Sequence, residues 1–176
     1  MKTQTLAKLE KINGELDDLV EYLKSYSNEQ LNHRPAEGVW SVIDVMHHLM
    51  RAEKLSHNYV KKKLSYGGSF KKAGLVSSWR LFILNSYLRL PFKFKAPELV
   101  SQVHFPDNND FNELQEEWRA QRKSLLSFLE EQPEELFDKE IYKHPIAGRV
   151  TLGGMVDFFT AHFQRHRKQI YRTIRG

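Results

Sequence analysis

The sequence predicts an all-α fold, a four-helix bundle with one long insertion between its second and third helices. Four segments carry apolar residues at spacings of three and four. Strict alternation of apolar and polar residues, which would indicate half-buried strands, is almost absent. The 176 residues match the length of one typical domain, so residues 1–176 are expected to form a single bundle.

The first two helices have clear sequence signals. Residues 3–25 carry one continuous apolar stripe with a polar back, as expected of a helix that faces a core. The second helix is predicted over residues 41–63. Ser41 and Asp44 stand three apart at its start, in the arrangement of a capping box, with Asp in place of the more usual Glu or Gln.

The last two helices follow the insertion. The third helix is predicted after the turn residues 108–110 and ends before Pro133, and the fourth begins near Thr151 and continues to the C-terminus. Residues 65–106, rich in glycine and proline, form the insertion. Its apolar run 79–90 is long enough for a short helix that packs over the bundle or over a partner.

Composition excludes several kinds of site and location. The chain has no cysteine, so disulfides, thiolate metal sites and cysteine nucleophiles are excluded. The first 21 residues lack the apolar core of a signal peptide, and no stretch reaches the roughly 18 apolar residues of a membrane span. We therefore expect a cytoplasmic protein without a membrane span. No serine triad, phosphate-binding glycine loop or dinucleotide fingerprint is present.

Charge is distributed in two opposed blocks. Residues 51–104 contain 11 Lys plus Arg and two Glu, whereas residues 105–140 contain four Lys plus Arg and 11 Asp plus Glu. The blocks can pair within the molecule or across a dimer, or the basic block can bind an anionic surface or nucleic acid. Aromatic residues lie among the basic residues of 61–95, but its apolar residues form a continuous cluster, so a sequence-specific nucleic-acid reader is not expected.

Two of the eight histidines have the spacing of metal ligands. His162 and His166 stand at i and i+4, which places both on one helix face beside apolar residues that turn toward the bundle. Two core histidines bonded to protein oxygens are the alternative interpretation. A third ligand would come from the second helix, where His48 has apolar neighbours and His47 has charged ones. This pattern favours His48 as the ligand and predicts that the His47 ring is solvated, with His47 as the alternative ligand.

Two separate segments resemble one family. The first reads Trp40-Ser41-Val42-Ile43-Asp44-Val45-Met46-His47-His48-Leu49 and continues to Ala52-Glu53; the second reads His144-Pro145, Gly148 and Thr151-Leu152-Gly153 and leads to His162, His166 and Gln169-Ile170. Both are similar to signatures of the DinB-like (DinB/YfiT-like) superfamily, in the same order along the chain.

The resemblance implies a four-helix bundle in which three histidines hold one divalent ion, nickel or zinc, often within a homodimer. Mapped onto this sequence, the ligands are His48, His162 and His166. Some relatives act as hydrolases, isomerases or thiol-dependent transferases, and many have no assigned activity. We expect a metal-dependent hydrolase or a thiol-dependent transferase that acts on a small molecule at the three-histidine site. A non-enzymatic bundle that binds a metal or a ligand is the alternative, and no catalytic residue besides the ligands is assigned.

Overall fold

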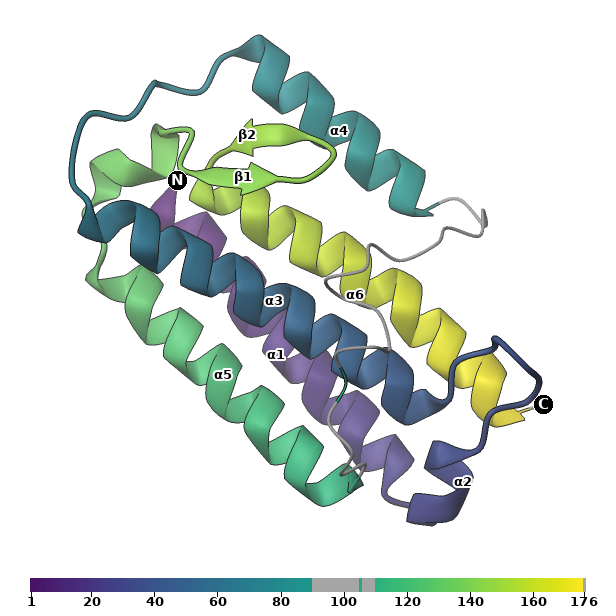
Figure 1. The fold of residues 1–176 in the computed structure, drawn as a ribbon. Helices are drawn as coiled ribbons and strands as arrows, with labels where there is room; N and C mark the ends of the chain where they lie inside the picture. Colours follow the sequence, from purple (N-terminus) through teal and green to yellow (C-terminus); the bar gives the residue numbers. More distant parts are fainter. Residues whose placement is uncertain (90–104, 106–109, 176) are drawn as a thin grey trace.

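The computed structural model describes residues 1–89, 105 and 110–175, and its described part contains the predicted bundle (Figure 1). Its four long helices are α1 (Lys2–Leu23), α3 (Val42–Ser65), α5 (Phe111–Glu131) and α6 (Leu152–Arg175). α6 packs against α1 and α3, and α5 packs against the same two helices from the other side. Residues 90–104, which contain the C-terminal part of the predicted insertion, lie outside the described residues.

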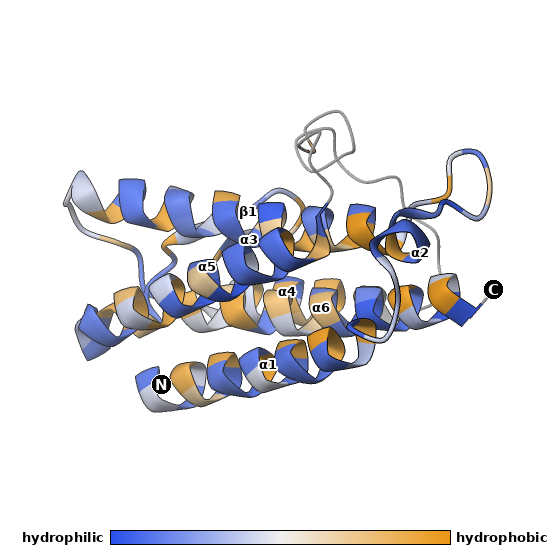
Figure 2. Ribbon diagram, turned by 90° about the horizontal axis from the view of Figure 1, so that it is seen from below, coloured by the Kyte–Doolittle hydropathy of each residue, from blue (hydrophilic) through white to orange (hydrophobic). Residues whose placement is uncertain are grey.

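The helices bury the stripes that the sequence predicts. α1 buries Leu9, Ile12, Leu16 and Leu19 completely, and the other bundle helices contribute one apolar face each. Figure 2 shows polar and apolar residues alternating around these helices. At the start of α3, Ser41 Oγ accepts a hydrogen bond from the Asp44 backbone N–H at 3.0 Å, and Asp44 Oδ2 accepts one from the Ser41 N–H at 3.0 Å. The predicted capping box is therefore confirmed.

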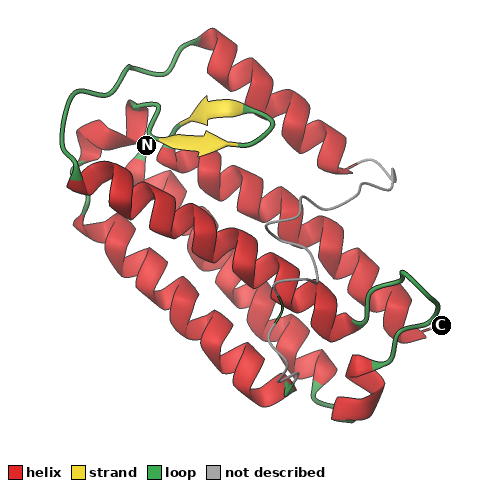
Figure 3. Ribbon diagram, viewed as in Figure 1, coloured by secondary structure: helices red, strands yellow, loops and turns green. Residues whose placement is uncertain are grey.

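Short elements that the sequence analysis did not predict connect the long helices (Figure 3). α2 (Asn28–Asn32) follows α1, and a 3-10 helix (Glu134–Asp138) follows α5. Strands β1 (Tyr142–His144) and β2 (Gly148–Val150) form an antiparallel hairpin just before α6. Gly148, at the end of the hairpin turn, has a φ of 71°, a conformation that glycine adopts without strain.

The described part of the insertion contains the expected helix, α4 (Leu75–Arg89), which starts four residues earlier than the apolar run that predicted it. α4 lies outside the bundle, against α6 and beside β2 (Figure 1). Gly154 leaves room for this contact, because a Cβ there would lie 2.9 Å from Leu81 Cδ2 and 3.2 Å from Val150 Cβ, and Leu81 would have to move. In the part of the chain that the structure describes, no helix combines the length and apolar character needed to cross a membrane.

Candidate metal centre

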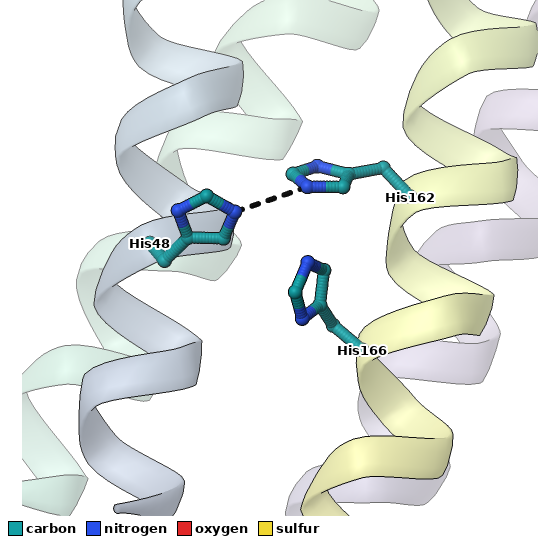
Figure 4. A group of neighbouring side chains, drawn as sticks. All are labelled: His48, His162 and His166. Carbon is teal, nitrogen blue, oxygen red and sulfur yellow. Dashed lines mark hydrogen bonds between the residues drawn. The ribbon is translucent and has the colours of Figure 1, made fainter. Parts of the chain in front are cut away.

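Three histidine side chains converge between α3 and α6 (Figure 4). His48 comes from α3, and His162 and His166 come from successive turns of α6, so the i, i+4 spacing places both rings toward α3. One nitrogen from each ring lies within 4.8 Å of the other two. The Nε2 atoms of His48 and His162 are 3.0 Å apart.

The third ring is oriented by a neighbour on the same helix. His166 Nδ1 and Gln169 Oε1 are 2.8 Å apart, and since the amide oxygen only accepts, Nδ1 donates the hydrogen bond. This bond leaves Nε2 of His166 as the free ring nitrogen. A partner on the second ring nitrogen is the usual way in which proteins fix the tautomer and direction of a metal-binding histidine.

Burial lowers the pKa of two of these rings, His162 and His166, and keeps them uncharged. His48 and His162 are buried and His166 is half-buried. Desolvation lowers the pKa of His162 well below its ordinary value, and the positive charges of His166 and His48 would lower it further. Desolvation, followed by repulsion from His48, lowers the pKa of His166 to about 3. Neutral imidazoles present the lone pairs that a cation requires.

The donor set fits a small divalent ion. Zinc–nitrogen bonds of about 2.0–2.1 Å in tetrahedral geometry place two ligand nitrogens about 3.3 Å apart. The separation of 3.0 Å between the Nε2 atoms of His48 and His162 is close to this value. In the described residues, three imidazole nitrogens converge on one point and no carboxylate lies among them. Such a set suits a metal ion of intermediate softness, such as zinc or nickel, which binds imidazole well.

Two of the imidazole rings pack against aromatic side chains. Phe158, one turn before His162 on α6, stacks on the His162 ring with a centroid separation of 5.1 Å and an angle of 17°. Trp40, just before α3, contacts the His48 ring at a centroid distance of 5.0 Å. These apolar contacts restrict rotation of the rings and exclude water from one side of each.

His47 lies outside this group, as the apolar surroundings of His48 predicted, but it is not solvated. Its side chain is only 4% exposed, and its ring stacks on Phe105 at a centroid distance of 5.5 Å. No described residue bonds to its Nε2. The expectation of a solvated ring is therefore wrong: an aromatic residue from the segment that precedes α5 covers the charged side of α3.

His144, at the end of β1, was not assigned a site role by the sequence analysis. Its Nδ1 accepts hydrogen bonds from the backbone N–H groups of Ile146 and Ala147, both at 3.1 Å, and its ring contacts Phe158 at a centroid distance of 4.4 Å. Burial lowers the pKa of His144 to about 4. The ring thus forms part of the hairpin turn that supports Phe158, which in turn packs on His162.

A buried ion pair lies between α3 and α5, and the sequence analysis did not predict it. Arg122 donates two hydrogen bonds to the Glu53 carboxylate, at 2.9 and 2.7 Å, and Trp118 Nε1–H donates a third at 2.8 Å. The Arg122 guanidinium also lies 4.9 Å from the centroid of the Phe163 ring. Since Phe163 follows His162 directly, this pair helps to fix α6 next to the histidine centre.

Comparison with known proteins identifies the family of this chain. A sequence profile that describes the DinB superfamily matches residues 12–170. The chain belongs to the DinB superfamily. The chain is also similar to YuaE of Bacillus subtilis (strain 168), an uncharacterized protein that is 24% identical over 148 residues, which cover 84% of this chain and 85% of YuaE.

A solved structure shares the fold of this DinB-superfamily chain. YfiT from Bacillus subtilis superposes with a TM-score of 0.61 over 99% of this chain and 86% of YfiT, at 17% sequence identity. YfiT is described as a probable metal-dependent hydrolase with an unusual four-helix bundle topology. At this identity the similarity establishes the bundle fold.

Proposed function

We propose that this protein binds one divalent metal ion through His48, His162 and His166 and acts as a metal-dependent hydrolase on a small molecule. The observation that carries the proposal is the convergence of three imidazoles, with one nitrogen from each within 4.8 Å of the others. Three protein ligands leave a coordination position open, which distinguishes catalytic from structural sites. The description of YfiT as a probable metal-dependent hydrolase supports the same reaction class.

In this proposal some residues bind the ion, one orients a ligand ring and others line the site. His48, His162 and His166 would hold the ion, nickel or zinc, and Gln169 directs the His166 ring through its 2.8 Å hydrogen bond. Phe158 and Trp40 pack on the ligand rings and provide apolar walls. An ion bound there supplies Lewis acidity, which activates water as a nucleophile or polarises a carbonyl group.

Metal binding is tested by alanine variants of the histidines, with His47→Ala as the matched control on the same turn of α3. Protein purified without a metal-binding tag is stripped with chelator and titrated calorimetrically with nickel or zinc. Wild type and His47→Ala are expected to bind one ion per chain. Loss of any one of the three proposed ligands is expected to weaken binding at least about a hundredfold.

Each alternative gives a different result. Full occupancy in His162→Ala or His166→Ala rejects the site. If His47→Ala loses metal binding and His48→Ala keeps it, the ligand from α3 is His47 and not His48. For the reaction, the metal-loaded protein is assayed on esters and amides, with and without small thiols. Metal-dependent hydrolysis supports the proposal, a thiol adduct assigns a transferase, and no turnover of any substrate assigns a binding protein.

We also propose that the protein is a homodimer. The support is the opposed charge of residues 51–104 and 105–140, which two copies side by side can match across a two-fold axis. Light scattering at micromolar concentration tests this, and a mass near the 20.8 kDa of one chain contradicts it.

A further inference from the structure

The outward face of α4 is an unusual surface for a helix of a globular protein. Five large apolar side chains on this face are 50–90% exposed, and they follow the helical spacing i, i+1, i+4, i+7, i+8: Leu75, Val76, Trp79, Phe82 and Ile83. We call these five residues the α4 stripe. They are half of the exposed large apolar residues in the described part of the chain, and the Trp79 and Phe82 rings stack at 5.7 Å.

The stripe does not result from an undocked helix. The opposite face of α4 packs on α6, where Leu84 is buried and Leu81 fits against Gly154. The Leu88 carbonyl also accepts a hydrogen bond from Arg165 on α6. α4 therefore stands as a convex ridge on the outside of the bundle, with one apolar face inward and a second one outward (Figure 1). Clustered apolar exposure of this kind indicates an interaction surface.

Three exposed cations lie beside the stripe. Arg80 is exposed on α4, and its Nη1 lies 3.5 Å from the place a Cβ would occupy at Gly148, so Arg80 adjoins the hairpin. On the hairpin, Lys143 and Arg149 are exposed and directly opposite each other. Like charges in this register repel each other. None of these three cations forms an ion pair with a described acidic residue, and we call the three the basic rim.

Charge and shape together select the binding partner. Residues 54–89 contain eight Lys or Arg and no acidic residue. Two copies that packed their stripes together around a two-fold axis would bring two basic rims together, which is unfavourable. A convex ridge has no groove for a peptide, whereas a bilayer accepts aromatic and aliphatic side chains at its interface and cations at its anionic headgroups.

We propose that the α4 stripe and the basic rim form a docking surface for an anionic lipid bilayer, which places the bundle on a membrane surface without spanning it. Trp79 and Phe82 enter the boundary between headgroups and acyl chains. Arg80, Lys143 and Arg149 contact lipid phosphates. This surface is independent of the histidine centre, so it holds whether or not the proposed metal chemistry does.

The test is sedimentation of the full chain with sucrose-loaded vesicles of phosphatidylcholine, with and without phosphatidylglycerol. Wild type is expected to bind only the vesicles that contain phosphatidylglycerol, and less tightly as salt rises. Because the chain has three tryptophans, the expected blue shift of emission on binding is assigned to Trp79 by its loss in Trp79→Ser. Trp79→Ser with Phe82→Ser, and separately Arg149→Glu, are each expected to weaken binding at least about fivefold. Leu55→Ser and Val39→Ser, which change apolar side chains 39% and 40% exposed elsewhere, are controls expected to bind as wild type.

Two results overturn the proposal. The first is an absence of binding to phosphatidylglycerol vesicles at low salt by protein with a wild-type circular dichroism spectrum. The second is binding that the stripe and rim variants leave unchanged. If wild type is a dimer in light scattering and the double variant Trp79→Ser with Phe82→Ser is a monomer, the stripe binds a second copy of the chain instead.

Discussion

Removing Arg122 is expected to destabilise the protein more than any surface substitution, because it leaves the Glu53 carboxylate charged and buried. Both side chains of this pair are nearly inaccessible, at 1% and 3% exposure. Arg122→Met removes two hydrogen bonds to the carboxylate and leaves only the bond from Trp118. Breaking a buried pair in this way costs about 3–5 kcal/mol. The total stability of a domain is about 5–15 kcal/mol.

Replacing both partners is expected to cost less than replacing either one. In a variant with Glu53→Met and Arg122→Met, no charge remains buried, and two apolar side chains of similar length fill the space. The remaining penalties are the unsatisfied Trp118 Nε1–H, about 1–3 kcal/mol, and the lost bond from Arg122 Nη1 to the Ile12 carbonyl. The double-mutant cycle should therefore show a coupling of several kcal/mol between Glu53 and Arg122.

Urea unfolding at pH 7, followed by circular dichroism, measures these free energies. Lys54→Met is the matched control on α3, because Lys54 pairs with Glu117 at 2.8 Å while both side chains are about half exposed. An exposed pair of this kind contributes about 0–1 kcal/mol. A cost below about 1 kcal/mol for Arg122→Met, equal to that of the control, would refute the reasoning.

Three further predictions concern the surroundings of the histidine centre. Between pH 6.5 and 4, His144 is neutral in the folded protein and takes up a proton on unfolding, so the free energy of unfolding falls as the pH falls. The variant His144→Asn has no titrating group there, and its Oδ1 can still accept the two turn hydrogen bonds. In unfolding titrations it should lose about 2–3 kcal/mol less stability over this pH range than wild type. An unchanged pH slope contradicts it. Gln169→Leu should weaken nickel or zinc binding about 10–100-fold in calorimetry, because the His166 tautomer is no longer fixed. Gly154→Val should expose α4 to proteolysis, because its side chain displaces Leu81; wild-type resistance to proteolysis would contradict this.

The parts of the fold that the sequence predicts are those set by local periodicity. The apolar stripes of the four long helices and the capping box at Ser41 involve residues within one or two turns of each other, and the structure confirms them. The hairpin was missed because its strands have three residues each, too few for alternation to show. α2 was missed for the same reason, since five residues carry no helical period.

The candidate centre was predictable to the extent that helix geometry determines it. The i, i+4 spacing of His162 and His166 and the apolar neighbours of His48 are local, and the structure brings these three rings together. The burial of His47 depends on Phe105, and the Glu53–Arg122 pair joins residues 69 positions apart. Contacts of this range are decided by how the helices pack, which the sequence pattern alone does not specify.

The two acidic side chains of α3 nearest to His48 explain why the centre consists of imidazoles alone. Both oxygens of Asp44 accept hydrogen bonds from Arg34, and one also accepts from the Ser41 N–H at the helix cap. Both oxygens of Glu53 are bonded by Arg122, and one by Trp118 as well. Neither carboxylate is free to act as a ligand. Oxygen-seeking ions such as magnesium and calcium would therefore lack their preferred donors here, whereas an ion that prefers nitrogen ligands, such as the proposed nickel or zinc, would find three imidazole nitrogens.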